Sequence, residues 1–151
     1  MELAEWNLNR RYLTRNRQRS RWPATVVLMT DLQHTIDRYF EWFNATDDTA
    51  RRTAVVAAWG EDARYVDPLF DARGHGSLEE LAAQVQARFP GHRFRRTSDI
   101  DAHHGLARWG WDMVGPDGGP PVATGVDFGV LAEDGRLREV VGFFESVNVP
   151  A

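Results

Sequence analysis

The period of the apolar pattern changes once along this chain, and that change limits the folds available to it. Before Pro90 the apolar residues recur at helical spacing, and after it they alternate with a period of two. Helices followed by strands must form two layers around one core, because each element has one apolar face to bury. The sequence therefore predicts an α+β fold in which three helices cover one face of a curved, mainly antiparallel sheet.

Capping patterns and turn residues set the expected boundaries of these elements. Thr30 with Gln33 and Ser77 with Glu80 each match a capping box, which marks the start of a helix. Asp134-Gly135 marks a hairpin between the last two strands. The expected helices span 31–45, 49–58 and 77–89, and the expected strands span 62–67, 71–74, 93–103, 106–114, 121–132 and 136–146.

The charge of the chain is divided unevenly. Residues 1–28 carry six arginines against two glutamates, a net charge of +4, whereas residues 29–151 carry a net charge of −8. The basic segment has no sustained apolar stripe, and Met29 stands just before the first helical pattern. We therefore expect residues 1–28 to be a disordered extension or the product of a start assigned too early, and residues 29–151 to form one domain.

The amino-acid composition excludes several classes of chemistry. The 151 residues include no cysteine, which excludes a disulfide framework, thiolate catalysis and cysteine-ligated metal. No apolar run approaches the roughly 18 residues of a membrane span. An acidic domain argues against a nucleic-acid surface. We expect a cytoplasmic protein with no membrane or nucleic-acid partner.

The stretch from Tyr65 to Asp71 places a carboxylate at the end of a short apolar strand. Pro68 fixes its own φ and disfavours a helical conformation at Asp67, so the chain is held extended there and then turns. A carboxylate held in this way can act as a proton acceptor in a pocket. It can equally form an Asx turn that ends the strand, and the stretch alone leaves both interpretations open.

The strand that contains Asp127 has two different faces. One face is apolar, and the other presents Asp127 between small residues, Ala123, Gly125 and Gly129. Small residues around one acid predict an empty volume above it, as a ligand cavity requires. The other interpretation is a bent strand whose glycines mark the points of curvature.

The strand over 106–114 also divides its residues between two faces. Trp109 and Trp111 share one face, where aromatic residues at this spacing are typical of a core. Arg108 and Asp112 share the other, and we expect them to form an outward-facing pair. His103 and His104 are adjacent in a predicted strand and should point to opposite faces, so no metal site is expected.

The order of these elements and motifs resembles that of a known family. The order of three helices, Tyr65-Val66-Asp67-Pro68 between them, and four long strands is similar to the cone of the nuclear transport factor 2-like (NTF2-like) superfamily, in its SnoaL-like polyketide cyclase and ketosteroid isomerase branch. The resemblance covers residues 31–147. Three short segments also match the pattern of ketosteroid isomerases: Arg38-Tyr39 with Asn44-Ala45-Thr46-Asp47, then Asp67-Pro68, then Val126-Asp127-Phe128.

The resemblance implies roles for individual residues. Asp67 matches the base that carries a proton between two carbons, and Tyr39 and Asp127 match the two donors that stabilise the enolate oxygen. It also implies a small apolar carbonyl compound as ligand, no cofactor, and a homodimer formed through the outer face of the sheet. The expected residues that bind the substrate are Trp109, Trp111, Val140, Phe144 and Phe89.

Three alternatives remain open at the level of sequence. The same fold supports other cofactor-free enzymes, such as an aldol-type cyclase, a dehydratase or an epoxide hydrolase, the last of which needs an Asp-Arg-Asp set on one face. A non-catalytic module that binds a small ligand or forms a dimer is a second alternative. A nucleic-acid role for the basic segment over 10–21 is the third.

Overall fold

The computed structural model describes residues 29–148, so the predicted N-terminal extension lies outside the described residues. The described chain forms three helices and seven strands in the expected order, helices before the long strands. The helices are α2 (Met29–Asn44), α3 (Asp48–Ala58) and α4 (His75–Arg88). The strands are β1 (Trp59–Val66), β2 (Asp71–Arg73), β3 (Arg93–Arg96), β4 (Asp101–His103), β5 (Leu106–Val114), β6 (Ala123–Leu131) and β7 (Leu137–Val147).

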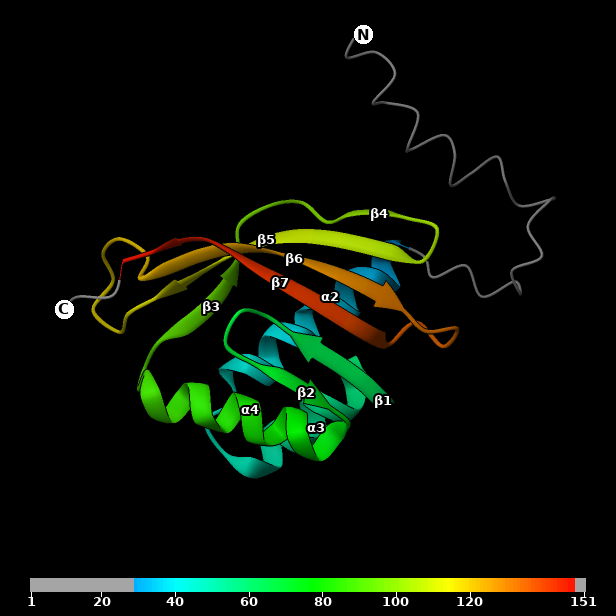
Figure 1. The fold of residues 1–151 in the computed structure, drawn as a ribbon, viewed down its shortest axis with the longest axis horizontal. Coiled ribbons are helices and arrows are strands. Elements are labelled where there is room, and N and C mark those ends of the chain that lie inside the picture. The colour runs from blue at the N-terminus through cyan, green and yellow to red at the C-terminus, as the bar shows by residue number, and fades with distance from the viewer. Residues whose placement is uncertain (1–28, 149–151) are drawn as a thin grey trace, which may run out of the picture.

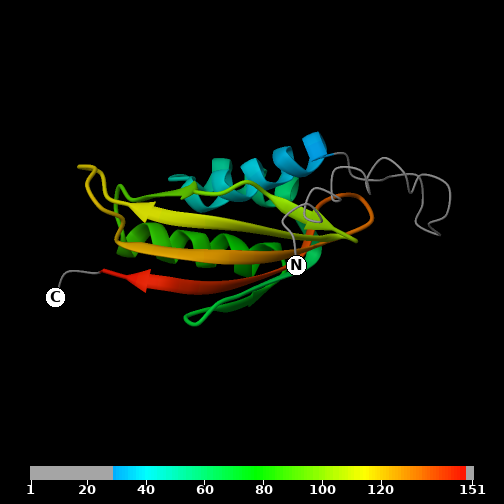
Figure 2. The same ribbon diagram turned by 90° about the horizontal axis from the view of Figure 1, so that it is seen from above.

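The strands form one mixed sheet in the order β2-β1-β7-β6-β5-β3, with β4 paired to β5. Only β1 and β7 run parallel, and the other pairs are antiparallel. All three helices lie on one side of the sheet (Figure 1). The long strands β5, β6 and β7 lie side by side when viewed from above (Figure 2). The α+β prediction is therefore confirmed.

The starts of α3 and α4 differ in how they are capped. The side chain of Asp47 accepts a hydrogen bond from the backbone N–H of Ala50 at 2.8 Å and so caps α3. The predicted capping box at Ser77 is wrong, because α4 already begins at His75. Gly74 precedes it with φ of +83° and donates its N–H to the carbonyl of Ala63, which turns the chain from β2 into the helix. The side chain of Thr30 lies outside the described residues.

The single strand predicted over 93–103 is divided into β3 and β4. Both pieces pair with β5, but Arg96 lies opposite Trp111 while Asp101 lies opposite Arg108. The intervening segment is therefore longer than the part of β5 that it faces, and it bulges out of the ladder. The hydroxyl of Ser98 accepts the N–H of Gly110 at 2.8 Å in place of a backbone carbonyl.

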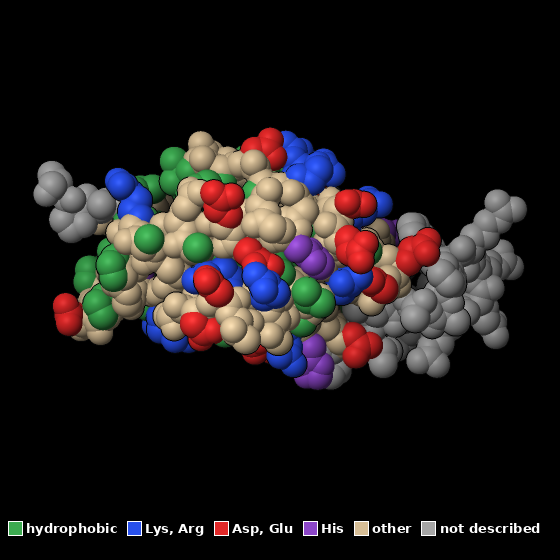
Figure 3. All heavy atoms as spheres, turned by 90° about the horizontal axis from the view of Figure 1, so that it is seen from below, with side chains coloured by type: hydrophobic (Ala, Val, Ile, Leu, Met, Phe, Trp, Pro, Cys, Tyr) green, Lys and Arg blue, Asp and Glu red, His purple; other side chains and the backbone are tan. Residues whose placement is uncertain are grey.

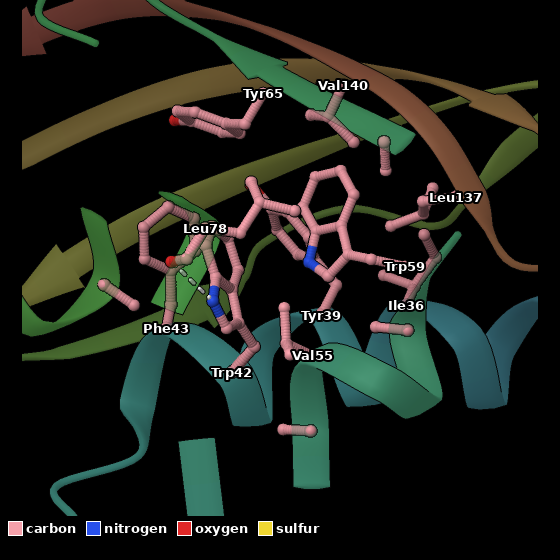
Figure 4. Packing of buried hydrophobic residues seen from close by; sticks show 14 of the residues in the cluster. Ile36, Tyr39, Trp42, Phe43, Val55, Trp59, Tyr65, Leu78, Leu137 and Val140 are labelled. Atoms are coloured by element: carbon pink, nitrogen blue, oxygen red, sulfur yellow. Dashed lines mark hydrogen bonds between the residues drawn. The ribbon is translucent and has the colours of Figure 1, made fainter. Parts of the chain in front are cut away.

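The core lies between the helices and the concave face of the sheet. Ile36, Tyr39 and Trp42 of α2 are almost completely buried and meet Trp59 and Tyr65 of β1 (Figure 4). The indole N–H of Trp42 donates to the carbonyl of Leu78 at 3.0 Å, which joins α2 to α4. An aromatic cluster of this kind fills the interior with rigid rings, in tilted or edge-to-face contacts.

The helical side of the molecule carries charged side chains of both signs. Acidic and basic side chains lie next to one another over this face (Figure 3). Neither α2, α3 nor α4 is long and apolar enough to cross a membrane.

Asn44, at the end of α2, holds the edge strand β3 in place. Its side-chain amide donates to the carbonyl of Phe94 at 2.9 Å, and its amide oxygen accepts the N–H of Phe94 at 2.8 Å. The amide thus pairs with the N–H and the C=O of Phe94, which are free to bond a further strand in an open sheet edge. This pairing protects the edge of the sheet.

We expect Asn44→Ala to lower the free energy of unfolding by about 2 kcal/mol, because two half-buried hydrogen bonds are lost together. Urea unfolding followed by circular dichroism measures this change. Gln84→Ala is the control, since the amide of Gln84 makes one exposed contact with Glu80 on the same helix. Equal stability of the two variants would contradict the role given to Asn44.

Candidate active site

Asp127 of β6 is a carboxylic acid inside the core. Its side chain is 2% exposed. The hydroxyl of Tyr39 donates to its Oδ2 at 2.6 Å, and the indole N–H of Trp111 donates to its Oδ1 at 3.1 Å. Both oxygens therefore have a donor, which is the condition for holding a carboxyl group away from water.

Burial changes the protonation of this group. Loss of water raises the pKa of Asp127 from 3.8 to about 7, the hydrogen bonds from Tyr39 and Trp111 oppose that rise, and the nearby charge of Asp67 adds to it. Burial and the charge of Asp127 also raise the pKa of Tyr39 well above its ordinary value. At neutral pH the site thus holds a neutral phenol beside an acid that exists in both protonation states.

Asp67 follows β1 at the edge of the same interior. Its Oδ1 accepts the backbone N–H groups of Leu69 at 2.7 Å and Phe70 at 2.8 Å, which is the Asx turn that the sequence allows. Its Oδ2 accepts the hydroxyl of Tyr65 at 2.8 Å. One oxygen is therefore fixed by the turn, while the other meets a phenol from the core.

Gly142 of β7 brings the two acids together. It is the partner of Asp127 in the β6–β7 ladder, and β1 with Asp67 at its end lies on the other side of β7. A Cβ atom at Gly142 would lie 2.9 Å from Oδ1 of Asp127, 3.3 Å from Cβ of Asp67 and 3.4 Å from the hydroxyl of Tyr65. The two acids converge over the central strand because that strand carries no side chain at this point.

The glycines of β6 do not leave open space beside Asp127, because indole rings lie over them. A Cβ atom at Gly125 would lie 2.5 Å from Cζ2 of Trp111, and one at Gly129 would lie 3.0 Å from Trp109. The small residues of β6 therefore make room for tryptophans of the neighbouring strand. The backbone carbonyl of Phe143 also approaches Gly125 closely, beside a register shift in the β6–β7 ladder.

The structure places the five predicted substrate-binding residues in two clusters. Trp109 and Val140 are buried in the main core, and Trp109 lies directly opposite Asp127 in the β5–β6 ladder. Trp111 belongs to a smaller cluster that includes the half-buried Phe89 and Phe144. The Trp111 and Phe144 rings are 5.8 Å apart, so Phe144 lies behind the indole that bonds Asp127.

The predicted arrangement on the other face of β5 is wrong. Asp112 does not form an exposed pair with Arg108, because its side chain is buried and pairs with Arg95 instead. Nε and Nη2 of Arg95 donate hydrogen bonds to Oδ1 and Oδ2 of Asp112, at 2.9 and 2.6 Å. The ladder explains this, because Arg95 lies directly opposite Asp112. This ion pair is on the face that points away from Asp127.

His103 and His104 do not point to opposite faces. His104 lies in the turn with φ of +49°, which brings its Nδ1 to 3.2 Å from Nδ1 of His103. Both rings are exposed. Within residues 29–148, no group of three or more histidine, aspartate or glutamate side chains is arranged to hold a metal ion.

A surface cavity of about 840 Å³ lies between α2, α3 and β3, away from the two acids. Its walls include Asp37 and Glu41 on one side and Arg93, Arg95 and Arg96 on the other. None of Tyr39, Asp67 and Asp127 lines it. The hydrogen-bonded acids rather than this open groove define the candidate site, because buried groups with shifted pKa values are the typical mark of an active site.

Two further residues, Tyr65 and Gly142, contribute to the site. Tyr65 was recognised only as part of the Asp67 stretch, yet two residues apart in a strand means the same face, and this spacing could have suggested its contact with Asp67. Gly142 carried no such signal, because its position between the acids depends on the pairing of β1 with β7.

Comparison with known proteins places this geometry among solved structures. No family model matches the chain, and no curated protein matches it. A protein from Agrobacterium tumefaciens, provisionally named an isomerase of the SnoaL-like family, is 34% identical, covers 78% of this chain and 99% of its own, and has a TM-score of 0.73.

Two more distant structures share the fold. A protein from Jannaschia sp. CCS1, provisionally named a SnoaL-like polyketide cyclase, is 17% identical over 89% of this chain and 99% of its own, with a TM-score of 0.62. A provisionally named polyketide cyclase from Sinorhizobium meliloti is 16% identical, covers 76% of this chain and 98% of its own, and has a TM-score of 0.59. Identities this low establish similarity of fold alone.

The raised pKa of Asp127 makes stability depend on pH. Asp127 keeps its proton in the folded protein up to about pH 7 but loses it near pH 4 when unfolded, so its contribution is complete below pH 4 and is lost as pH rises to 7. The full loss is on the order of 4 kcal/mol. Asp127→Asn should remove this slope in urea unfolding measured from pH 4 to pH 8.

Asp71→Asn is the control for that measurement. The hydrogen bonds of Arg64 hold the pKa of Asp71 below its ordinary value, so its contribution is lost as pH falls, in the opposite sense. An Asp127→Asn variant with the same pH slope as the wild-type protein would show that Asp127 ionises like a solvated acid.

Proposed function

This chain belongs to the SnoaL-like family, and from that premise we propose that it is a cofactor-independent enzyme that transfers a proton at a carbonyl compound. The observation that carries the proposal is the pairing of a buried acid, Asp127, with the phenol of Tyr39, next to a second acid at the rim of the same interior. Two similar structures are provisionally named an isomerase and a polyketide cyclase, and the proposed proton transfer would serve either reaction on a ketone.

The proposed step needs a base and a stabilised oxygen. Asp67 takes the α-proton of the ketone, the C–H electron pair forms the enolate double bond, and the carbonyl oxygen becomes an oxyanion. Tyr39 and protonated Asp127 then donate hydrogen bonds to that oxygen. An isomerase returns the proton from Asp67 to another carbon, whereas a cyclase lets the enolate carbon attack a second carbonyl of the same molecule.

The arrangement around Asp67 suits a base that must not move. Two backbone N–H groups hold Oδ1, and the hydroxyl of Tyr65 orients Oδ2 toward the interior. A base fixed in this way can reach two neighbouring carbons of a bound substrate without a change of rotamer. The buried aromatic rings around Tyr39 would provide the apolar surroundings for the ligand.

We expect Asp67→Asn to reduce proton exchange at a ketone by about 100-fold or more. The asparagine oxygen can still accept the two N–H groups of the turn, so the fold should be preserved. The measurement is incorporation of deuterium at the α-carbons of a panel of cyclic ketones in D₂O, followed by proton NMR. Asp71→Asn, on the exposed strand β2, is the matched control and should keep wild-type exchange.

The second candidate is a protein that binds a small ligand without reacting with it. It is favoured by the Asx turn at Asp67, which is sufficient on its own to explain an aspartate at the end of β1. The deuterium-exchange experiment, combined with a binding measurement, distinguishes the two candidate functions. Binding of 4-nitrophenol, a planar analogue of an enolate, without deuterium exchange in any ketone would support the binder and contradict the enzyme.

We also propose that two copies of the chain pair through the outer face of the sheet. Phe128 of β6 and Phe143 of β7 are 43% and 53% exposed, and their rings lie 6.0 Å apart in an edge-to-face contact. Exposed aromatic residues that are grouped on one face are typical of an interface.

Phe143→Asp should convert a dimer into a monomer, because it would bury a charge at the centre of that interface. Sedimentation velocity measures the change. Val56→Asp is the control, since Val56 is similarly exposed on α3, on the opposite layer of the molecule. A wild-type protein that sediments as a monomer would contradict the proposal.

A further inference from the structure

The indole N–H of Trp109 has no hydrogen-bond acceptor among the described residues, although its side chain is 1% exposed. Two other buried indoles are paired: the N–H of Trp42 bonds the carbonyl of Leu78, and that of Trp111 bonds Asp127. Because buried donors are almost always paired, an unpaired one beside a reactive group indicates a partner that binds there.

The position of the Trp109 ring is fixed by its neighbours. The outer edge of the six-membered ring lies over Gly129, where a Cβ atom would be 3.0 Å from Cζ3 and Cη2. The ring also meets that of Tyr39 in an edge contact, with centroids 5.3 Å apart. These contacts leave the indole little freedom to turn toward another acceptor.

The N–H of Trp109 lies close to the carboxyl group of Asp127. Trp109 lies opposite Asp127 in the β5–β6 ladder, and its N–H is near enough to the carboxyl to help lower the pKa of Asp127. This N–H does not form a hydrogen bond with either carboxyl oxygen of Asp127. Those oxygens already accept hydrogen bonds from Tyr39 and Trp111.

We propose that the indole N–H of Trp109 is a third hydrogen-bond donor to the substrate oxygen, beside Tyr39 and Asp127. The proposal rests on the proposed function and makes its substrate class narrower: a planar compound whose oxygen gains negative charge, as in an enolate or a phenolate. A neutral donor fixed in an apolar site binds such an oxygen more strongly as its charge develops, without any ion or cofactor.

Trp59 is the natural comparison. Its indole N–H is also unpaired among the described residues, and its side chain is fully buried. It lies on β1, however, and packs against Trp42 and Tyr39 rather than opposite Asp127. An oxygen bound between Tyr39 and Asp127 should therefore affect the N–H of Trp109 more than that of Trp59.

The test uses the full chain labelled with ¹⁵N and follows the indole N–H resonances. These are assigned with Trp42→Phe, Trp59→Phe and Trp109→Phe. Addition of 4-nitrophenol should move the Trp109 resonance strongly and leave that of Trp42 in place. The isosteric 4-nitrotoluene, which lacks the oxygen, should leave the Trp109 resonance nearly unchanged.

Affinities provide the second measurement. Trp109→Phe keeps a ring over Gly129 but removes the donor, so 4-nitrophenol should bind about tenfold more weakly or worse, while 4-nitrotoluene binds equally to both proteins. Binding of 4-nitrophenol with an unmoved Trp109 resonance would overturn this inference alone. Absence of binding of 4-nitrophenol to the wild-type protein would overturn the proposed function, and this inference with it.

Discussion

The burial of one carboxyl group, that of Asp127, constrains the rest of this structure. A carboxyl in the core requires donors for both oxygens, and the fold supplies them from two different layers, Tyr39 from a helix and Trp111 from the next strand. Those contacts hold α2 against the concave face of the sheet. The same burial raises the pKa of the acid to about 7, so the contact that joins the layers also creates its chemistry.

The second constraint is the absence of a side chain at Gly142. Asp67 directly follows β1 and Asp127 lies on β6, the two strands that flank β7, and adjacent strands are about 4.8 Å apart. The acids could not approach each other over a residue with a Cβ atom, because that atom would be within 3.3 Å of both side chains. Parallel pairing of β1 with β7 sets this arrangement, because Val66 lies opposite Val141 and the next residue, Asp67, then lies beside Gly142.

Local patterns in the sequence predicted most of the elements, and the resemblance to a family pointed to Tyr39, Asp67 and Asp127. The alternation along β6 can be read directly and sets Asp127 among small residues, but it left open whether that face holds a cavity or a bend. The same reasoning failed where register decides the result. The glycines of β6 were expected to leave a cavity, but the pairing of β5 with β6 sets Trp109 and Trp111 over them.

Asp112 and His104 show two further limits of the same kind. Asp112 is on the predicted face, but its partner is set by the β3–β5 register, which brings Arg95 opposite to it. His104 leaves strand geometry through a left-handed backbone conformation that is uncommon for a residue with a side chain, and no pattern predicts it. Alternation therefore assigns faces correctly, whereas contacts between strands require knowledge of how the strands pair.

The two interpretations of Asp67 are compatible in the structure. The Asx turn uses only Oδ1, and the contact with Tyr65 uses Oδ2, so one carboxylate can end a strand and face the interior at once. What separates the two acids is their surroundings: Asp67 stands at a half-exposed strand end with backbone donors, and Asp127 lies among indole and phenol rings. Acid–base chemistry at neutral pH needs two such groups in unlike environments, and an environment is a property of the fold rather than of a motif. The short motifs therefore indicate where the acids are, and the aromatic interior determines what they can do.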